Sequence, residues 1–97
     1  SLPKRADAVF CYNDSTALAA MKYCLNEGLK IPHDIAIVGF DDIVAAAAAI
    51  PPLSTVRVGK EALGRAGVEL LLNKRDEEPS QLTVPVELVV RESSRGD

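Results

Sequence analysis

The stretch that most constrains the fold spans residues 35–42 and reads IAIVGFDD. Its apolar part is rich in β-branched residues, passes a glycine and an aromatic, and stops at two adjacent carboxylates, Asp41 and Asp42. A short apolar run bounded by turn signals is typical of a strand that is buried on both faces. Because such strands belong to parallel sheets covered by helices, the sequence predicts an α/β fold.

A second stretch nearer the start of the chain has the same pattern. Residues 8–12 form a mostly apolar run that is followed by Asn13 and Asp14. In open parallel sheets, ligands bind outside the carboxyl ends of the strands. Both strands would therefore deliver polar side chains to one rim of the sheet. This rim is the candidate site, with Asn13 and Asp41 as its principal residues.

Helical spacing and turn residues predict the elements around these strands. Residues 16–27 form an amphipathic helix that Asp14 or Ser15 caps and Gly28 ends. Strand, helix and strand together have the size of a βαβ unit. Five alanines at 45–49 predict a short helix, because alanine is the best helix former.

The second half of the chain predicts a strand, a helix and a strand. Residues 53–58 form a short extended crossing with the polar side chains at 54, 55 and 57 exposed. Residues 60–73 match the helical template, and two internal glycines, each costing about 1 kcal/mol relative to alanine, indicate close approach by another element. Residues 82–90 alternate as a last strand, which an internal proline places at a sheet edge.

Asn13 and Asp41 together suit a neutral ligand. Asn13 offers two donors and an acceptor, and an ionised Asp41 offers acceptors only, so the pair would bind hydroxyls or ring nitrogens. The alternative for Asn13 is helix capping or an Asx-turn, which alone accounts for its position. For Asp42 we expect capping of the following helix or exposure to solvent, because adjacent strand residues point to opposite faces.

Charge and spacing argue against several functions. The net charge is −3 and the basic residues are scattered, so these residues are not expected to contact nucleic acid. A single histidine, His33, and two distant cysteines predict no metal site. No glycine-rich phosphate loop indicates a nucleotide cofactor. The sequence supplies neither a nucleophile nor a base, so we expect a protein that is not an enzyme and has no cofactor.

The cysteines and the hydropathy pattern indicate the compartment. Cys11 and Cys24 fall in a predicted strand and a predicted helix, and we expect free, buried thiols in a reducing compartment. No apolar run approaches the roughly 20 residues that span a bilayer, and no signal-peptide pattern opens the chain. We therefore expect a cytoplasmic protein without a membrane partner.

Four blocks of sequence, in this order, carry a family resemblance. They are DAVFCYND at 7–14, PHDIAIVGFDD at 32–42, PPLSTVR at 51–57 and LVVRES at 88–93. With them the chain resembles, over nearly its whole length, the C-terminal part of the LacI/GalR family of bacterial transcription regulators. The resemblance implies a periplasmic-binding-protein-like fold of type I, with two doubly wound parallel α/β subdomains around a cleft. Only the C-terminal portion of that core would be present here.

The resemblance also implies a division of the chain and a ligand. Residues 1–57 and 81–93 would belong to the C-terminal subdomain, and the helix within 58–80 would pack on the other subdomain. Asn13 and Asp41 would line the cleft and bind a small sugar-like or polyol effector, or else a purine or nucleoside. Val58 stands where the family often has an effector-binding glutamine. Further candidates for the cleft rim are Tyr12, Phe40, Asp42 and Val58.

Partners follow from the same resemblance. The helix starting near Ser15 and the segment after Asp42 would form much of a homodimer face. DNA would be bound only through a helix-turn-helix domain that is absent from this chain. Effector binding in the cleft would then control DNA binding.

Three other functions share parts of the pattern. A periplasmic sugar-binding protein of a transport system, the alternative we keep, has the same architecture but needs an export signal and normally avoids free thiols. A phosphoacceptor receiver domain needs a further acidic cluster and a rim lysine, and Lys60 follows no suitable strand. A hydrolase that used Asp41 and Asp42 would lack a nucleophile and a metal set.

Overall fold

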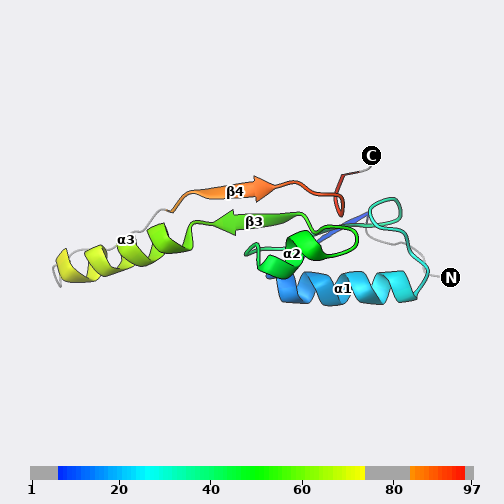
Figure 1. Cartoon of the computed structure of the whole chain (residues 1–97), viewed down its shortest axis with the longest axis horizontal. Coiled ribbons are helices and arrows are strands. Elements are labelled where there is room, and N and C mark those ends of the chain that lie inside the picture. The colour runs from blue at the N-terminus through cyan, green and yellow to red at the C-terminus, as the bar shows by residue number, and fades with distance from the viewer. Residues whose placement is uncertain (1–6, 74–83, 96–97) are drawn as a thin grey trace.

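A computed structural model of the chain describes residues 7–73 and 84–95. Figure 1 shows α1, α2 and the first two strands gathered at one end of an elongated molecule and α3 at the other, with β3 and β4 between them. The principal extents are 57 × 30 × 20 Å. The elements, in chain order, are β1 (Ala8–Phe10), α1 (Asp14–Asn26), β2 (Ala36–Val38), α2 (Val44–Ala48), β3 (Thr55–Val58), α3 (Lys60–Asn73) and β4 (Val86–Val89).

The parallel pair β1–β2 is the centre of the fold. Ala8 lies opposite Ala36 and Phe10 opposite Val38, with α1 connecting the two strands. Val38 also forms a parallel bridge with Ser54, which brings the chain entering β3 alongside β2. The predicted α/β class with parallel strands is therefore confirmed, and so is the predicted βαβ unit.

The core lies between α1 and β2. Ala17, Met21 and Cys24 recur at helical spacing on α1 and are all buried. They pack in one cluster with Ile37 of β2 and with Leu53, both of which have no exposed surface. Burial of apolar surface is the main stabilising contribution to such a cluster, at roughly 25 cal/mol per Å². This packing holds the start of α1 against the carboxyl end of β2, where the candidate site lies.

The alanine run forms the predicted short helix. α2 covers Val44–Ala48, and Ala46 is its one buried residue. The carbonyl oxygen of Ala46 accepts a hydrogen bond from the amide of Leu53 at 2.8 Å, which ties α2 to the start of the crossing. α2 therefore contacts the rest of the fold through the buried methyl group of Ala46 and through this backbone hydrogen bond.

β3 and β4 form a separate antiparallel ladder, here named the outer ladder, that leads away from the core. Thr55 lies opposite Val89 and Val58 opposite Val86. The sequence predicted that the last strand lies at an edge, and both strands of this two-stranded sheet are edges. The ladder carries α3 outward, as Figure 1 shows.

α3 follows its predicted bounds but none of its residues is buried. Leu71 and Leu72, for example, are each 78 % exposed. The prediction that another element approaches Gly64 and Gly67 is wrong for the described part of the chain, because a Cβ at either glycine would meet no atom within 4 Å. Within the ranges that the structure describes, no helix is long and apolar enough to cross a membrane.

Several boundaries and exposures differ from those predicted. α1 begins at Asp14, two residues earlier than expected, and the strands are shorter than the apolar runs that contain them. Residues 82 and 83 of the expected last strand lie outside the described residues. Ser54 and Thr55 were expected to be exposed but are 1 % and 0 % exposed. They are buried because the chain joins β2 at this point and because both hydroxyls bond to other segments.

The close packing of β2 against the start of α1 predicts a strong effect of Gly39→Ala. A Cβ at position 39 would overlap a carboxyl oxygen of Asp14 and lie 3.2 Å from the Cβ of Ala17. Overpacking of this kind lowers the free energy of unfolding by about 1–3 kcal/mol. Denaturant unfolding of the purified protein measures the loss.

Gly64→Ala is the matched control, because the added methyl group meets open space in a helix. It should raise the free energy of unfolding by roughly 0.5–1 kcal/mol. A Gly39→Ala protein as stable as the wild type would contradict the packing described here.

Candidate functional site

Asn13 lies where β1 has ended and α1 begins. It is the N-cap of α1, in extended conformation, and its Oδ1 accepts a hydrogen bond from the amide of Thr16 at 2.8 Å. The capping alternative for Asn13 is therefore confirmed, and the expected cap at Asp14 or Ser15 is wrong. Within the described residues the amide nitrogen of Asn13 has no hydrogen-bond partner, so its two donors are available.

Asp14, which the sequence identified only as a cap, is a fully buried carboxyl group. Its Oδ1 accepts a hydrogen bond from Oγ1 of Thr55 at 2.6 Å, and its Oδ2 accepts one from the amide of Ile43 at 2.8 Å. Its own amide donates to the carbonyl oxygen of Phe40 at 3.0 Å. A buried carboxyl group is costly unless it is hydrogen-bonded, and this one is. No local sequence pattern indicates this role, because the partners lie 29 and 41 positions further along the chain.

The two carboxylates that end the β2 stretch lie in an unusual turn. Asp41 has φ +127° and Asp42 has φ +58°, a region that residues other than glycine rarely adopt. Each such residue costs about 1–3 kcal/mol and persists only where its surroundings hold it. The amide of Asp41 donates to the carbonyl oxygen of Val56 at 2.8 Å, and that of Asp42 to Oγ1 of Thr55 at 3.3 Å. The first residues of β3 therefore hold this turn.

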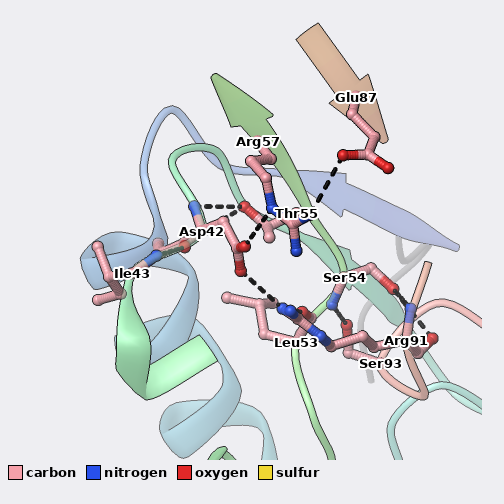
Figure 2. A network of polar contacts seen from close by, with 10 residues as sticks. Asp42, Ile43, Leu53, Ser54, Thr55, Arg57, Glu87, Arg91 and Ser93 are labelled. Carbon is pink, nitrogen blue, oxygen red and sulfur yellow. Dashed lines mark hydrogen bonds and ion pairs between the residues drawn. The ribbon is translucent and has the colours of Figure 1, made fainter. Parts of the chain in front are cut away.

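The side chain of Asp42 lies between two arginines, as Figure 2 shows. Its Oδ2 is 2.8 Å from Nε of Arg57, on β3, and its Oδ1 is 2.9 Å from Nη1 of Arg91, just beyond β4. The expectation that Asp42 caps the next helix or is solvated is wrong. The side chain is only 12 % exposed, and α2 has no side-chain cap. Asp42 instead links the two strands of the outer ladder to the turn.

The ion pairs shift the pKa values of this cluster. The pKa of Asp42 is lowered, chiefly by the hydrogen bond from Arg57, with burial opposing the shift and Arg91 adding to it. The same hydrogen bond to Asp42 is the main cause that raises the pKa of Arg57. Asp42 is consequently an ionised acceptor that is already occupied by protein donors.

Asp41 is in the opposite situation. Its side chain is 41 % exposed, and its Oδ1 is 3.5 Å from Nζ of Lys60, itself 63 % exposed. An exposed pair of this kind contributes about 0–1 kcal/mol and is readily exchanged for another partner. Of the two adjacent carboxylates, Asp41 is thus the one with acceptor capacity for a ligand.

The structure brings Asn13 and Asp41 to the same edge of the fold. Asp14 and Phe40 are joined by a backbone hydrogen bond, and Asn13 and Asp41 are the neighbours of that pair. The other rim candidates are dispersed. Tyr12 is 78 % exposed beside Asn13, Phe40 is half-buried, and Val58 lies at the far end of β3 opposite Val86.

Buried serines fasten the segment that follows β4. The hydroxyl of Ser93 donates to the carbonyl oxygen of Ile37 at 2.6 Å and accepts from the amide of Ser54 at 2.8 Å. Oγ of Ser54 accepts from the amide of Arg91 at 2.7 Å. Figure 2 shows the bonds of Ser54 to Ser93 and Arg91. Together with the bond from Ser93 to Ile37, they anchor both segments of the outer ladder to β2.

The two cysteines are free and buried, as predicted. Burial raises the pKa of the Cys11 thiol, and the neighbouring Cys24 adds to that shift. A raised pKa lowers the thiolate fraction and hence the reactivity. Within the described ranges, no three His, Cys, Asp or Glu residues are grouped as a metal site would require.

The site can therefore offer neutral amide donors and one exposed carboxylate, a set that suits hydroxyl groups. A hollow of about 370 Å³ also lies near His33 and Glu92, but it is next to the chain that enters β2, not the end that carries Asp41.

The fold is α/β with parallel strands, and the chain belongs to the periplasmic binding protein-like domain family, whose model matches residues 1–94. Its relatives are regulators of the LacI/GalR type, so the resemblance found in the sequence is confirmed. This chain is 39 % identical over 93 residues to the HTH-type transcriptional repressor PurR of Aliivibrio fischeri, and the match covers 93 % of this chain and 28 % of the relative. This chain is also 43 % identical over 89 residues to the repressor MelR of Bacillus subtilis, and the match covers 90 % of this chain and 26 % of MelR.

Solved structures agree. The complex of the regulator CelR with cellobiose matches with TM-score 0.82 and 37 % identity, over 92 % of this chain and 28 % of that one. A LacI family regulator of Lactobacillus casei with bound sucrose matches with TM-score 0.75 and 32 % identity. The match covers 93 % of this chain and 34 % of that regulator. The chain thus spans about 28 % of the length of the curated relatives it matches.

The lowered pKa of Asp42 predicts how stability depends on pH. Because the folded-state pKa lies below the ordinary value of 3.8, the contribution of Asp42 is complete above about pH 5. It is lost as the pH falls through the lowered pKa. Asp42→Asn should therefore reduce the free energy of unfolding most at pH 7, and the gap to the wild type should narrow as the pH falls below about 4. Denaturant unfolding across this pH range measures the gap.

Glu61→Gln is the control, since Glu61 is 90 % exposed and pairs only with Arg65 on its own helix. We expect it to change stability by less than about 0.5 kcal/mol at any of these pH values. Parallel pH curves for Asp42→Asn and the wild type would contradict the ion-pair assignment.

Proposed function

We propose that the complete protein is a transcription regulator controlled by a small neutral effector, and that this chain supplies one wall of the effector cleft. The observation that carries the proposal is the position of Asp41. Its carboxylate is exposed after the carboxyl end of β2, on a turn that the fold holds against its backbone preference, and Asn13 lies at the same edge of the fold. In open α/β sheets this edge is the usual place of ligand binding.

The proposed effector is a sugar or a related polyol. Hydroxyl groups both donate and accept, so one can donate to Asp41 while another accepts from Asn13. Two of the similar regulators were solved with cellobiose and with sucrose, which favours this class. A purine base or nucleoside is the second class, because ring nitrogens and exocyclic amines offer the same two kinds of partner.

The proposed mechanism links the effector to the outer ladder. Asp41 bonds to β3 through its amide, and Asp42 holds Arg57 of β3 and Arg91 beyond β4. A ligand that binds Asp41 better in one arrangement of the ladder than in another would shift the balance between the two. Such coupling is typically worth 1–3 kcal/mol. In the complete regulator this shift would reach a helix-turn-helix domain outside this chain.

The solvent exposure of α3 supports the proposed division of the chain between two subdomains. Residues 1–57 and 81–93 would form one subdomain, and the helix within 58–80 would pack on the other. α3 has no buried residue, and its leucines at 71 and 72 are largely exposed, as expected for a helix whose partner lies elsewhere.

A homodimer is proposed through α1 and the segment after Asp42. Large apolar side chains are exposed in both places. Tyr23 of α1 is 66 % exposed, and Val44 and Ile50 are 92 % and 88 % exposed. Exposed apolar surface of this kind marks interaction sites.

Calorimetric titration of the complete protein with glucose, sucrose, cellobiose, adenine and adenosine tests the effector proposal. We expect one class to bind and Asp41→Asn to weaken that binding at least tenfold, about 1.4 kcal/mol, because the amide replaces one charged acceptor. Lys60→Ala removes the other partner of the Asp41 ion pair and should change the affinity less than twofold. Binding that survives Asp41→Asn unchanged would refute the assignment of Asp41.

Asn13 allows its capping role to be separated from ligand binding. Asn13→Asp keeps an oxygen for the amide of Thr16 but removes both amide donors. It should leave the free energy of unfolding nearly unchanged and weaken effector binding about tenfold. Asn13→Ala should lose about 1 kcal/mol of stability as well, because the cap is gone.

Thermal unfolding and the same titration measure the two quantities. Equal affinity of Asn13→Asp and the wild type would leave Asn13 as a cap alone.

A further inference from the structure

We propose that Asp14 is a positioning residue, which fixes the turn at residues 40–43 and thereby the ligand carboxylate of Asp41. This inference rests on the proposed function for its consequence in binding. Its geometric basis is a fully buried residue whose carboxyl group accepts hydrogen bonds from the turn amide of Ile43 and from the hydroxyl of Thr55, and whose backbone amide donates to Phe40.

The turn needs such support because its backbone is strained. Asp41 and Asp42 both have positive φ, and an unsupported pair would relax to the ordinary extended or helical regions. Relaxation would rotate the peptide planes and change the direction in which the Asp41 side chain points. The position of the candidate ligand residue therefore depends on groups outside the turn.

Asp14 brackets the strained pair. On the near side its amide donates to the carbonyl oxygen of Phe40, and on the far side its Oδ2 accepts from the amide of Ile43. Between them, its Oδ1 accepts from Oγ1 of Thr55, and that hydroxyl oxygen accepts in turn from the amide of Asp42. The side chain of Asp14 thus holds the amide of Ile43 directly and that of Asp42 through Thr55, and its backbone amide holds the carbonyl oxygen of Phe40.

The roles of Asn13 and Asp14 are divided. An acidic residue in the first turn of a helix is commonly explained by the helix dipole. Here the free amide of Thr16 is already capped by Asn13, and the Asp14 carboxyl group bonds instead to Ile43 and Thr55. The dipole favours a negative charge at this position but does not explain those contacts.

Gly39 is adapted to the same arrangement. It lies immediately before the turn, its φ is not positive, and a Cβ there would overlap an Asp14 carboxyl oxygen. The glycine is therefore required for space and not for backbone conformation. The absence of a side chain at position 39 lets the carboxyl group reach the turn.

The test uses the complete protein and the variant Asp14→Asn. This change preserves the side-chain volume but puts an amide NH2 group, a donor, where one carboxyl oxygen accepts a hydrogen bond. We expect effector affinity, measured by calorimetry with the panel named above, to fall at least tenfold under conditions where the variant is folded. Met21→Ala is the matched control. Met21 is 3 % exposed in the same core and appears in none of the contacts that hold the turn. It should lower thermal stability by at least as much but change affinity less than twofold.

Thr55 provides a rescue series. Thr55→Ser keeps the hydroxyl that links Asp14 to the amide of Asp42 and should bind within threefold of the wild type. Thr55→Val keeps the shape but loses the hydroxyl and should weaken binding like Asp14→Asn.

Amide hydrogen exchange of the effector-free protein separates this proposal from the proposed function. Peptides covering residues 39–44 should exchange at least tenfold faster in Asp14→Asn than in the wild type or Met21→Ala. If no panel compound binds the wild type but exchange rises as stated, the effector proposal fails and the positioning role stands. If exchange and affinity in Asp14→Asn match those of Met21→Ala, Asp14 is a core residue only and the positioning role is overturned.

Discussion

The fold around the candidate site depends on the bonding of the buried Asp14 carboxyl group to Thr55 and Ile43. It joins the start of α1, the turn after β2 and the start of β3, which are far apart in the sequence. Such a group is costly to bury without partners and stabilising with all of them, so it specifies one arrangement of the three segments. Gly39 next to it supplies the space.

Two adjacent carboxylates acquire different roles from this arrangement. Asp42 is held by Arg57 and Arg91 and is nearly enclosed, whereas the carboxylate of Asp41 is exposed and pairs with the exposed ammonium group of Lys60. The positive φ of both residues allows the chain to aim them at different partners within one turn. The result is an exposed carboxylate, the proposed ligand residue, whose immediate neighbour holds Arg57 of β3 and Arg91 beyond β4. A change at the edge and a change in the ladder are therefore physically linked.

Much of the architecture could be predicted from local pattern. The βαβ unit follows from two apolar runs and the helical spacing between them, and the bounds of α3 coincide with the predicted residues. The gathering of Asn13 and Asp41 at one edge could be predicted because each follows the end of an apolar strand run. The burial of Ser54 and Thr55, the ion pairs of Asp42 and the role of Asp14 could not be predicted, because each depends on residues 13 to 49 positions away. The open surroundings of Gly64 and Gly67 were also missed, since a glycine in a helix does not reveal whether a partner is present.

By itself, the sequence determined the class of fold, the order of its elements, the family and the edge at which polar residues gather. These follow from periodicity, turn residues and short motifs, which act over a few neighbouring positions. Only the tertiary structure decided which polar residue faces outward and which is enclosed. Asp14, Asp41 and Asp42 show this difference. All three are aspartates, but each has different partners and therefore a different role. Partners brought together by packing, not the residue type, set the hydrogen bonding and charge of each group.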